Sequence, residues 1–216
     1  MSESLFKKND EVNLLVKQSD KTLVVNHVYC VGRNYSAHAR EMGSDDRQLP
    51  FFFSKPDWAI TTSDVKYPLG TNNLQYEVEL VIVVGEGMSI FGFGVGVDLT
   101  RRDLQLEAKT KGKPWLRAKS FVGSAPISEI IISKRDFDYR NMDLLLTVNG
   151  NVKQSGHCRD MIWSPSEILC EMAAEIPLQP GDLVFTGTPE GVGTIVKGDK
   201  ITASIPGIVE LSFSII

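Results

Sequence analysis

Two glutamates separated by one residue stand at the start of an apolar run. Glu77 and Glu79 flank Val78, and residues 80–84 continue as Leu-Val-Ile-Val-Val before Gly85. Such a run is typical of a buried strand, and side chains alternate across a strand, so the two carboxylates share one face. Neighbouring carboxylates against a core are costly unless a cation or a proton neutralises them. The pair therefore indicates a cation site, or else the solvated face of a surface strand.

A third carboxylate, Asp98, ends the glycine-rich apolar segment 91–99. With the two glutamates it would complete an all-oxygen site for a hard dication. Mg²⁺ suits such a site because it takes few carboxylates and keeps several waters. The chain has no His or Cys cluster that would indicate zinc. The alternative, and the more ordinary use of a lone aspartate here, is to cap a helix that starts near Thr100.

A histidine and a glutamate suited to activating water lie in the segment 34–42, for which we predict a short helix. His38 and Glu41 are three residues apart and so share a face of that helix. A carboxylate orients an imidazole and raises its basicity, which suits the pair to deprotonating a water molecule. The alternative is an ordinary surface pair.

Several cationic and amide side chains lie near these carboxylates in the sequence, namely Lys55, Arg102, Gln105 and Lys119. Cations beside a metal site suit an anionic, oxygen-rich substrate, and they can stabilise a developing enolate or oxyanion. The alternative is solvated surface charge, which is the usual state of Lys and Arg. Lys119 lies between apolar segments and is the one we expect to be partly buried.

The elements that must position these residues are mostly strands. We expect strands over 24–31, 51–53, 74–84 and 183–185, and a hairpin that turns either at Asn149 and Gly150 or at Gly150 and Asn151. Helical patterns cover 100–109 and 164–174, the second with Ser166 available as a cap. The glycines at 92, 94 and 96 do not complete a dinucleotide fingerprint, because position 97 is valine. Strands do not alternate with long helices, so the fold class is mainly β (α+β) rather than doubly wound.

Composition excludes some classes of function. The 216 residues fit one domain with a small N-terminal extension, and 42% hydrophobic and 23% charged residues are ordinary for a globular protein. A formal net charge of −4 disfavours a nucleic-acid partner, and no apolar run is long enough for a membrane helix. Three scattered cysteines indicate reduced thiols, and the first residues resemble neither a signal nor a transit peptide. We expect a cytoplasmic protein, with a mitochondrial location as the alternative in a eukaryote.

Six segments in order resemble the fumarylacetoacetate hydrolase family, and the resemblance covers about residues 25 to 216. They are Val31–Tyr35 with His38 and Glu41, Phe53–Pro56, Glu77–Glu79, Asp98–Gln105, Ala118–Phe121 and Thr186–Gly193. The chain is most similar to the short, single-domain acylpyruvases and fumarylpyruvate hydrolases of that family. Residues 40–43 and 51–56 favour the fumarylpyruvate side.

The resemblance implies a mixed β-sandwich or roll with a few short helices, in which residues 1–24 are an extension and 25–216 the catalytic domain. It implies Mg²⁺ or Mn²⁺ as cofactor and a homodimer as the assembly. The implied roles are metal ligation by Glu77, Glu79 and Asp98; water activation by His38 and Glu41; contact with metal and substrate by Lys119; charge stabilisation by Arg102 and Gln105; and substrate binding by Arg33 and Thr188.

The implied reaction is hydrolysis of a carbon–carbon bond in an acylpyruvate-type 2,4-dioxo acid, such as fumarylpyruvate or acetylpyruvate, to pyruvate and a carboxylic acid. Oxaloacetate decarboxylation and keto–enol isomerisation of a 2-hydroxydienoate are alternatives, as is a catalytically inactive metal-binding protein. One departure lies beside the implied metal ligands: relatives carry an additional helix where this chain has only residues 86–92. Either the connection is shortened or residues are absent, and the site survives if Asp98 still returns to Glu77 and Glu79.

Overall fold

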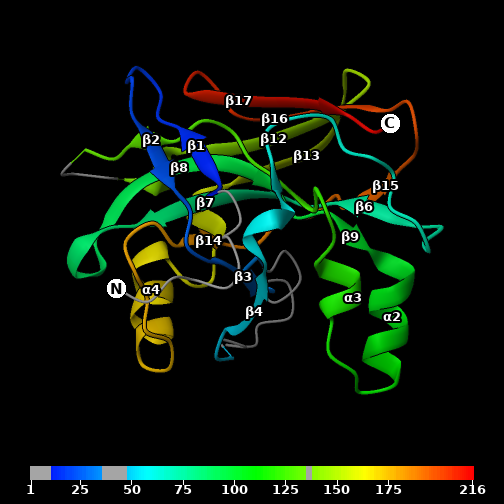
Figure 1. Ribbon diagram of the computed structural model, residues 1–216, viewed down its shortest axis with the longest axis horizontal. Helices are drawn as coiled ribbons and strands as arrows, with labels where there is room; N and C mark the ends of the chain where they lie inside the picture. Colours follow the sequence, from blue (N-terminus) through cyan, green and yellow to red (C-terminus); the bar gives the residue numbers. More distant parts are fainter. Residues whose placement is uncertain (1–10, 36–47, 135–137) are drawn as a thin grey trace, which may run out of the picture.

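The structure is a computed structural model that describes residues 11–35, 48–134 and 138–216. Strands dominate it and helices are few and short, which confirms the expected mainly β fold class (Figure 1). The proposed helix at 34–42 lies outside the described residues except for its first two positions. Those two are not helical, because Tyr35 forms a β-bridge with Met161.

A mixed six-stranded sheet forms the centre of the fold. Only the pair formed by β14 (Leu183–Phe185) and β3 (Val28–Gly32) is parallel. Every residue of the central strand β7 (Val78–Val84) is buried, because both faces of the sheet are covered, and this explains its unbroken apolar run. In order across the sheet, the strands are β11 (Ile131–Ile132), β8 (Ile90–Val97), β7 (Val78–Val84), β14 (Leu183–Phe185), β3 (Val28–Gly32) and β4 (Phe51–Lys55).

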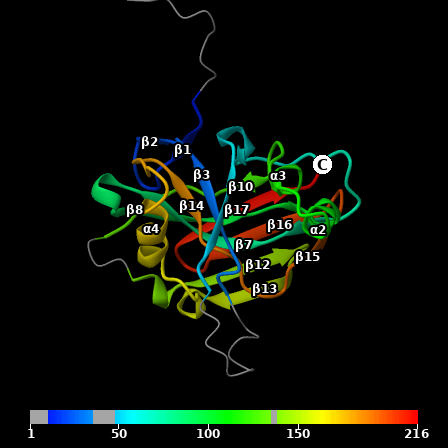
Figure 2. The same ribbon diagram turned by 90° about the horizontal axis from the view of Figure 1, so that it is seen from below.

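A four-stranded antiparallel sheet packs across β7 and β8 (Figure 1, Figure 2). Leu80 and Ile82 of β7 face it in the larger core cluster, whereas Val81 and Val83 pack on the other side in a second cluster. The hairpin was predicted correctly: its turn residues Asn149 and Gly150 have φ of 51° and 77°, as such a turn needs. In order across this four-stranded sheet, the strands are β13 (Asn151–His157), β12 (Asp143–Val148), β16 (Lys200–Ile205) and β17 (Val209–Ser214), of which β12 and β13 form the hairpin.

The predicted continuous strand over 74–84 is wrong at one residue, Glu77. There the chain leaves β6 (Leu74–Tyr76) and enters β7, and the two strands belong to different sheets. β6 pairs with β15 (Gly193–Ile195) and β9 (Thr100–Arg101), whereas β7 pairs with β8 and β14. Glu77 therefore lies at the junction of two sheets.

Three α-helices are described. α2 (Arg102–Thr110) and α3 (Leu116–Lys119) lie together at one end of the sheets, and α4 (Pro165–Ala173) lies at the other (Figure 1, Figure 2). Asp98 does not cap α2, whose N-cap position is Arg101. The predicted cap Ser166 is also wrong, because Ser164 begins α4 in a capping box with Glu167, which leaves Pro165 at the first helical position.

The shortened connection after β7 is a tight turn. It holds the 3₁₀-helix η2 (Glu86–Met88), and Gly85 N–H donates to the Ser89 carbonyl at 2.7 Å. β8 then runs antiparallel to β7 along its whole length, with Val97 opposite Val78. Asp98 N–H donates to the Glu77 carbonyl at 2.8 Å, so the short connection still returns Asp98 to the glutamates.

Minor elements complete the described chain. β1 (Asn13–Leu15) and β2 (Thr22–Val24) form a hairpin, and β5 (Ile60–Thr61) pairs with β10 (Ala125–Pro126). Short 3₁₀-helices are η1 (Asp57–Ala59), η3 (Tyr139–Asn141) and η4 (Cys158–Asp160). The domain boundary at residue 24 stays a prediction. In the described ranges, no helix has both the length and the apolar character needed to cross a membrane.

Candidate metal centre and its cavity

Three carboxylates meet at the junction of the two sheets. Glu77 comes from the break between β6 and β7, Glu79 from β7, and Asp98 from the residue after β8. Each offers one oxygen atom, and these atoms lie within 4.8 Å of one another. All three side chains are buried. The structure therefore brings together the three residues that the sequence predicts as metal ligands.

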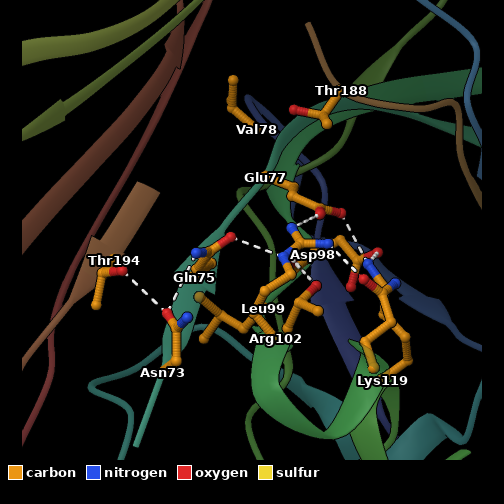
Figure 3. A network of polar contacts seen from close by, with 12 residues as sticks. Asn73, Gln75, Glu77, Val78, Asp98, Leu99, Arg102, Lys119, Thr188 and Thr194 are labelled. Atoms are coloured by element: carbon orange, nitrogen blue, oxygen red, sulfur yellow. Dashed lines mark hydrogen bonds and ion pairs between the residues drawn. The ribbon is translucent and has the colours of Figure 1, made fainter. Parts of the chain in front are cut away.

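Three cationic side chains surround the carboxylates. Lys119 Nζ lies 2.7 Å from Glu77 Oε2 and 2.6 Å from Asp98 Oδ2, and Lys55 Nζ lies 2.8 Å from Asp98 Oδ1. The Arg102 guanidinium pairs with Glu77 Oε1 (Figure 3). Because three carboxylates face three cations, the formal charges of these six groups cancel. We name these six residues the charge cluster.

The protonation of the charge cluster follows from its geometry. Burial, together with the charges of Asp98 and Glu77, raises the pKa of the Glu79 carboxyl well above its usual value, although Gly187 N–H donates to its Oε2 at 2.6 Å. Burial alone would also raise the pKa of Asp98, but Lys119 and Lys55 outweigh burial and lower it. Glu79 is thus the carboxylate that the protein's own cations compensate least.

Lys119 is held as an ammonium by the carboxylates that it contacts. Burial would lower its pKa, but the charges of Asp98 and Glu77 outweigh burial and raise the pKa above the ordinary lysine value. It lies at the end of α3 and is buried, as the sequence indicates. An ammonium in this position can stabilise negative charge on a bound molecule.

The donor set fits a hard divalent ion. Three carboxylates provide oxygen ligands only, which suits Mg²⁺ or Mn²⁺ better than zinc or copper. A dication would also supply the positive charge that Glu79 lacks, since that carboxylate is buried beside two others. These residues could therefore hold a metal ion without rearrangement of the backbone.

A cavity of about 180 Å³ opens onto the three carboxylates. Five further predicted site residues line it, namely Arg33, Arg102, Gln105, Lys119 and Thr188. Lys109 and an aromatic wall of Phe51, Phe53 and Trp115 complete much of the lining. His38 and Glu41, the predicted water-activating pair, lie outside the described residues.

Arg102 is held in place by a chain of polar contacts from the three-stranded sheet. Its Nε donates to Gln75 Oε1 at 2.7 Å, and Gln75 Nε2 in turn donates to Asn73 Oδ1 at 3.2 Å (Figure 3). Arg102 also donates to Gln105 Oε1, which leaves the Gln105 amide NH₂ as a donor for another group. The two residues at the start of α2 are therefore oriented before anything binds.

A buried glutamine that the sequence analysis missed links the metal centre to the loop after β14. Gln154 Oε1 accepts from Val78 N–H at 2.9 Å, and its Nε2 donates to Thr188 Oγ1 and to the Pro189 carbonyl, both at 2.9 Å. Gln154 thus connects the residue between the two glutamates with Thr188. Its only sequence signal is a polar residue within a polar strand, which does not reveal burial.

Two lysines of the site are absent from the roles that the resemblance implies, although Lys55 is among the cations that the sequence places near the carboxylates. Lys55 is fully buried against Asp98, and only its place between aromatic residues and a proline distinguishes it in the sequence. Lys109 could have been found from spacing, because Arg102, Gln105 and Lys109 fall at i, i+3 and i+7 and therefore share a helix face.

The fold and the site together define a class of mainly β proteins in which three buried carboxylates open onto a cavity with cationic side chains in its lining. Residues 27–216 match the model of the family described as fumarylacetoacetate (FAA) hydrolase C-terminal, and the chain belongs to this family. A crystal structure of fumarylpyruvate hydrolase from Pseudomonas aeruginosa, in complex with Mn²⁺ and pyruvate, is similar with a TM-score of 0.91 and 40% identity over 99% of each chain.

Curated relatives carry a different activity in their names. The mitochondrial oxaloacetate tautomerase FAHD1 of Bos taurus is 37% identical over 201 residues, which are 88% of this chain and 91% of that protein. Its Arabidopsis thaliana counterpart is 37% identical over 202 residues, 87% of this chain and 90% of that protein. A hydrolase or a related isomerase or tautomerase activity is therefore supported.

Proposed function

We propose that this protein is a divalent-metal-dependent hydrolase that cleaves a carbon–carbon bond in acylpyruvate-type 2,4-dioxo acids, with fumarylpyruvate as its leading substrate. One observation carries the proposal: the buried carboxylates Glu77, Glu79 and Asp98 open onto a cavity that also presents cationic and amide groups. The similarity to a fumarylpyruvate hydrolase that binds Mn²⁺ and pyruvate supports both the metal and the pyruvate end of the substrate.

The three carboxylates would hold Mg²⁺ or Mn²⁺. A divalent ion bound there supplies Lewis acidity, which stabilises negative charge on the oxygens of a 2-oxo acid. The charge cluster is formally neutral, so a dication leaves two positive charges in excess. The excess suits a dianion, and a 2,4-dioxo acid with two carboxylates is one.

Three side chains would bind and polarise the substrate oxygens. Lys119 stays protonated, Arg102 is oriented by Gln75, and Gln105 retains its NH₂ donor. Thr188 Oγ1 accepts a hydrogen bond from Gln154, so its own O–H is available to donate to a carboxylate. Such preorganised donors typically contribute about 10²–10³ each in kcat.

The hydrolytic step needs a water molecule that loses a proton. We assign its deprotonation to His38, oriented by Glu41, because of the family resemblance of these two positions. Hydroxide adds to the distal carbonyl carbon. The bond between that carbon and the pyruvate methylene then breaks, and its electron pair stays with the pyruvate fragment as an enolate. Protonation of the enolate carbon gives pyruvate, and the other product is the carboxylic acid, fumarate for fumarylpyruvate.

Tautomerisation of oxaloacetate is the second candidate, and the 37% identity to proteins with that name favours it. It uses the same enolate-stabilising groups but no attack by water. Decarboxylation of oxaloacetate would use them too. The two reactions differ in what is deprotonated: hydrolysis requires a base for water, whereas tautomerisation requires a base that removes a proton from the carbon next to the 2-oxo group and an acid that protonates the enolate oxygen.

A substrate panel tests the proposal. The metal-loaded protein should remove the ultraviolet absorbance of fumarylpyruvate and release pyruvate, faster than it consumes acetylpyruvate or changes oxaloacetate. Glu79→Gln should abolish turnover, and His38→Ala should lower hydrolysis by about 10²–10⁴. Full hydrolysis by His38→Ala would refute the assigned base. A metal-loaded protein that leaves both 2,4-dioxo acids intact would refute the hydrolase, and one that also leaves oxaloacetate unchanged would favour an inactive metal-binding protein.

Two further expectations from the sequence stay proposals. A homodimer is the assembly that the family resemblance supports, and light scattering on the purified chain would test it. A cytoplasmic location rests on the scattered cysteines, which are free thiols in the structure.

A further inference from the structure

One face of α2 extends the cavity lining away from the metal centre. Arg102, Gln105 and Lys109 all line the cavity, and they fall at i, i+3 and i+7 of the helix. At 1.5 Å of rise per residue, Lys109 stands about 10 Å further along the axis than Arg102. Since Arg102 pairs with Glu77, Lys109 marks the end of the cavity that is remote from the carboxylates.

Lys109 is a cation without an anionic partner in the described part of the chain. Its Nζ lies 4.9 Å from the centroid of the Trp115 ring, which holds it over the aromatic wall. Lys111, two residues on, instead pairs with Glu107 at 2.7 Å. Burial first, and then the positive charges of Arg102 and Arg33, lower the pKa of the Lys109 ammonium. Positive charges therefore lie close together around Lys109.

Arg33 supplies a second cation to the lining of the same cavity, and its charge is one of those that lower the pKa of Lys109. It is a non-glycine residue with a φ of 59°, in the left-handed region that side chains disfavour. The next residue fixes this conformation, because Asn34 is buried and donates to the carbonyls of Trp163 at 2.9 Å and Thr186 at 2.7 Å. Arg33 also lacks an ion pair within the described ranges, so the fold holds a strained, uncompensated cation at the cavity.

We propose that Arg33 and Lys109 form a subsite for the second carboxylate of a dianionic 2-oxo acid, the carboxylate remote from the pyruvate end. The proposal rests on the proposed function, because that function places the pyruvate end at the metal centre. Within the charge cluster, Lys55, Lys119 and Arg102 already pair with carboxylates, which leaves Arg33 and Lys109 for the second carboxylate of the ligand. Between the two ends, Phe51, Phe53 and Trp115 form an apolar wall against which a planar unsaturated chain packs.

The subsite makes Lys109 a specificity-determining residue. A ligand with one carboxylate satisfies the metal centre but leaves Arg33 and Lys109 unpaired, whereas a dicarboxylate of the right length satisfies both ends. Discrimination between such ligands does not require turnover, so binding can be measured on its own.

Calorimetric titration of the Mn²⁺-loaded protein tests the subsite with two unreactive probes of equal length, 2-oxoheptanedioate and 2-oxoheptanoate. The wild-type protein should bind the dicarboxylate at least about tenfold more tightly, the value of one charge-assisted hydrogen bond. Lys109→Met should abolish this preference and leave the affinity for the monocarboxylate unchanged. Arg33→Gln should act in the same direction, and Lys109→Arg should retain the preference. Lys111→Met is the matched control, because it removes a lysine from the same helix outside the cavity.

Failure of the subsite and failure of the proposed function give different results. No preference in the wild-type protein, or an unchanged preference in Lys109→Met, would overturn the subsite even if fumarylpyruvate is hydrolysed. An equal loss for both probes would overturn it too, since it would indicate a general effect on the site. A wild-type preference that Lys109→Met abolishes supports the subsite even if no 2,4-dioxo acid is turned over.

Discussion

Replacement of Lys55 by methionine tests whether the charge cluster is a balanced unit. Lys55 is fully buried, its Nζ lies 2.8 Å from Asp98 Oδ1, and it also donates to the carbonyls of Leu99 and Lys119. Methionine fills a similar volume, so the packing loss is small. Removal of one partner from a buried ion pair costs about 3–5 kcal/mol, because the other charge stays buried without compensation. An exposed pair would cost only about 0–1 kcal/mol.

Urea unfolding of the metal-free protein measures this loss. Lys55→Met should lower the free energy of unfolding by about 3–5 kcal/mol, a large share of the about 5–15 kcal/mol typical of a domain. Lys66→Met is the control, since Lys66 is exposed and should change it by less than about 0.5 kcal/mol. The double variant Lys55→Met/Asp98→Asn removes both charges, so its loss should be smaller than the sum of the single losses by about 1–3 kcal/mol.

Mn²⁺ provides a second readout for the same variant. Without Lys55 the cluster carries a net negative charge, so the dication should stabilise Lys55→Met more than the wild-type protein at the same concentration. A loss below about 1 kcal/mol for Lys55→Met would refute the balanced cluster. Additive losses in the double variant would refute it as well, because the pair would then contribute no coupling.

Three further changes probe the surroundings of the site. Burial would raise the pKa of Asp103, but hydrogen bonds from Thr71 and Asn72 lower it. Asp103→Asn should therefore lower the free energy of unfolding in urea by about 1–2 kcal/mol at pH 7. This loss should shrink as the pH falls below about 4, because the wild-type carboxylate is then protonated. Gly187→Ala places a Cβ 2.7 Å from Asn34 Cβ at a φ of 99° and shifts the N–H that binds Glu79, so calorimetry should show Mn²⁺ affinity falling about 10–100-fold. Gln154→Leu leaves Val78 N–H without its partner and should lower both unfolding free energy, by about 1–3 kcal/mol, and kcat.

The sequence predicted the site better than the path of the chain through it. Alternation along a strand placed Glu77 and Glu79 together, and the structure brings both to Asp98. Yet the chain changes from one sheet to the other at Glu77. The sequence could not predict this change, because the apolar pattern of 74–84 is the same for one strand in a single sheet as for two strands in different sheets. The sequence also predicted the wrong N-cap for α4, Ser166 instead of Ser164, because both serines precede an apolar run.

Residues whose role depends on distant partners escaped the sequence analysis for a physical reason. Gln154 is 76 positions from Val78, with which it bonds. Lys55, 43 positions from Asp98, was named only as one of several cations near the carboxylates, and its contact with Asp98 was not predicted. Nothing local distinguishes a glutamine that ends up buried from one that faces water, since burial is decided by which strands pair. The connection at η2 shows the converse: it is short, and the β7–β8 pairing on either side of it sets the position of Asp98.

The two activities named among the relatives are compatible with one charge cluster. Oxaloacetate and fumarylpyruvate are both dianionic 2-oxo acids, and both reactions place negative charge on the carbon next to the 2-oxo group. A formally neutral cluster that gains a dication, with Lys119 and Arg102 among its own cations, would stabilise that charge in either case. What distinguishes hydrolysis is the attack of water on the distal carbonyl, whereas tautomerisation moves a proton of the substrate itself. Under our proposal the choice between the activities therefore rests on whether the site admits and activates water, the role we assign to His38 with Glu41.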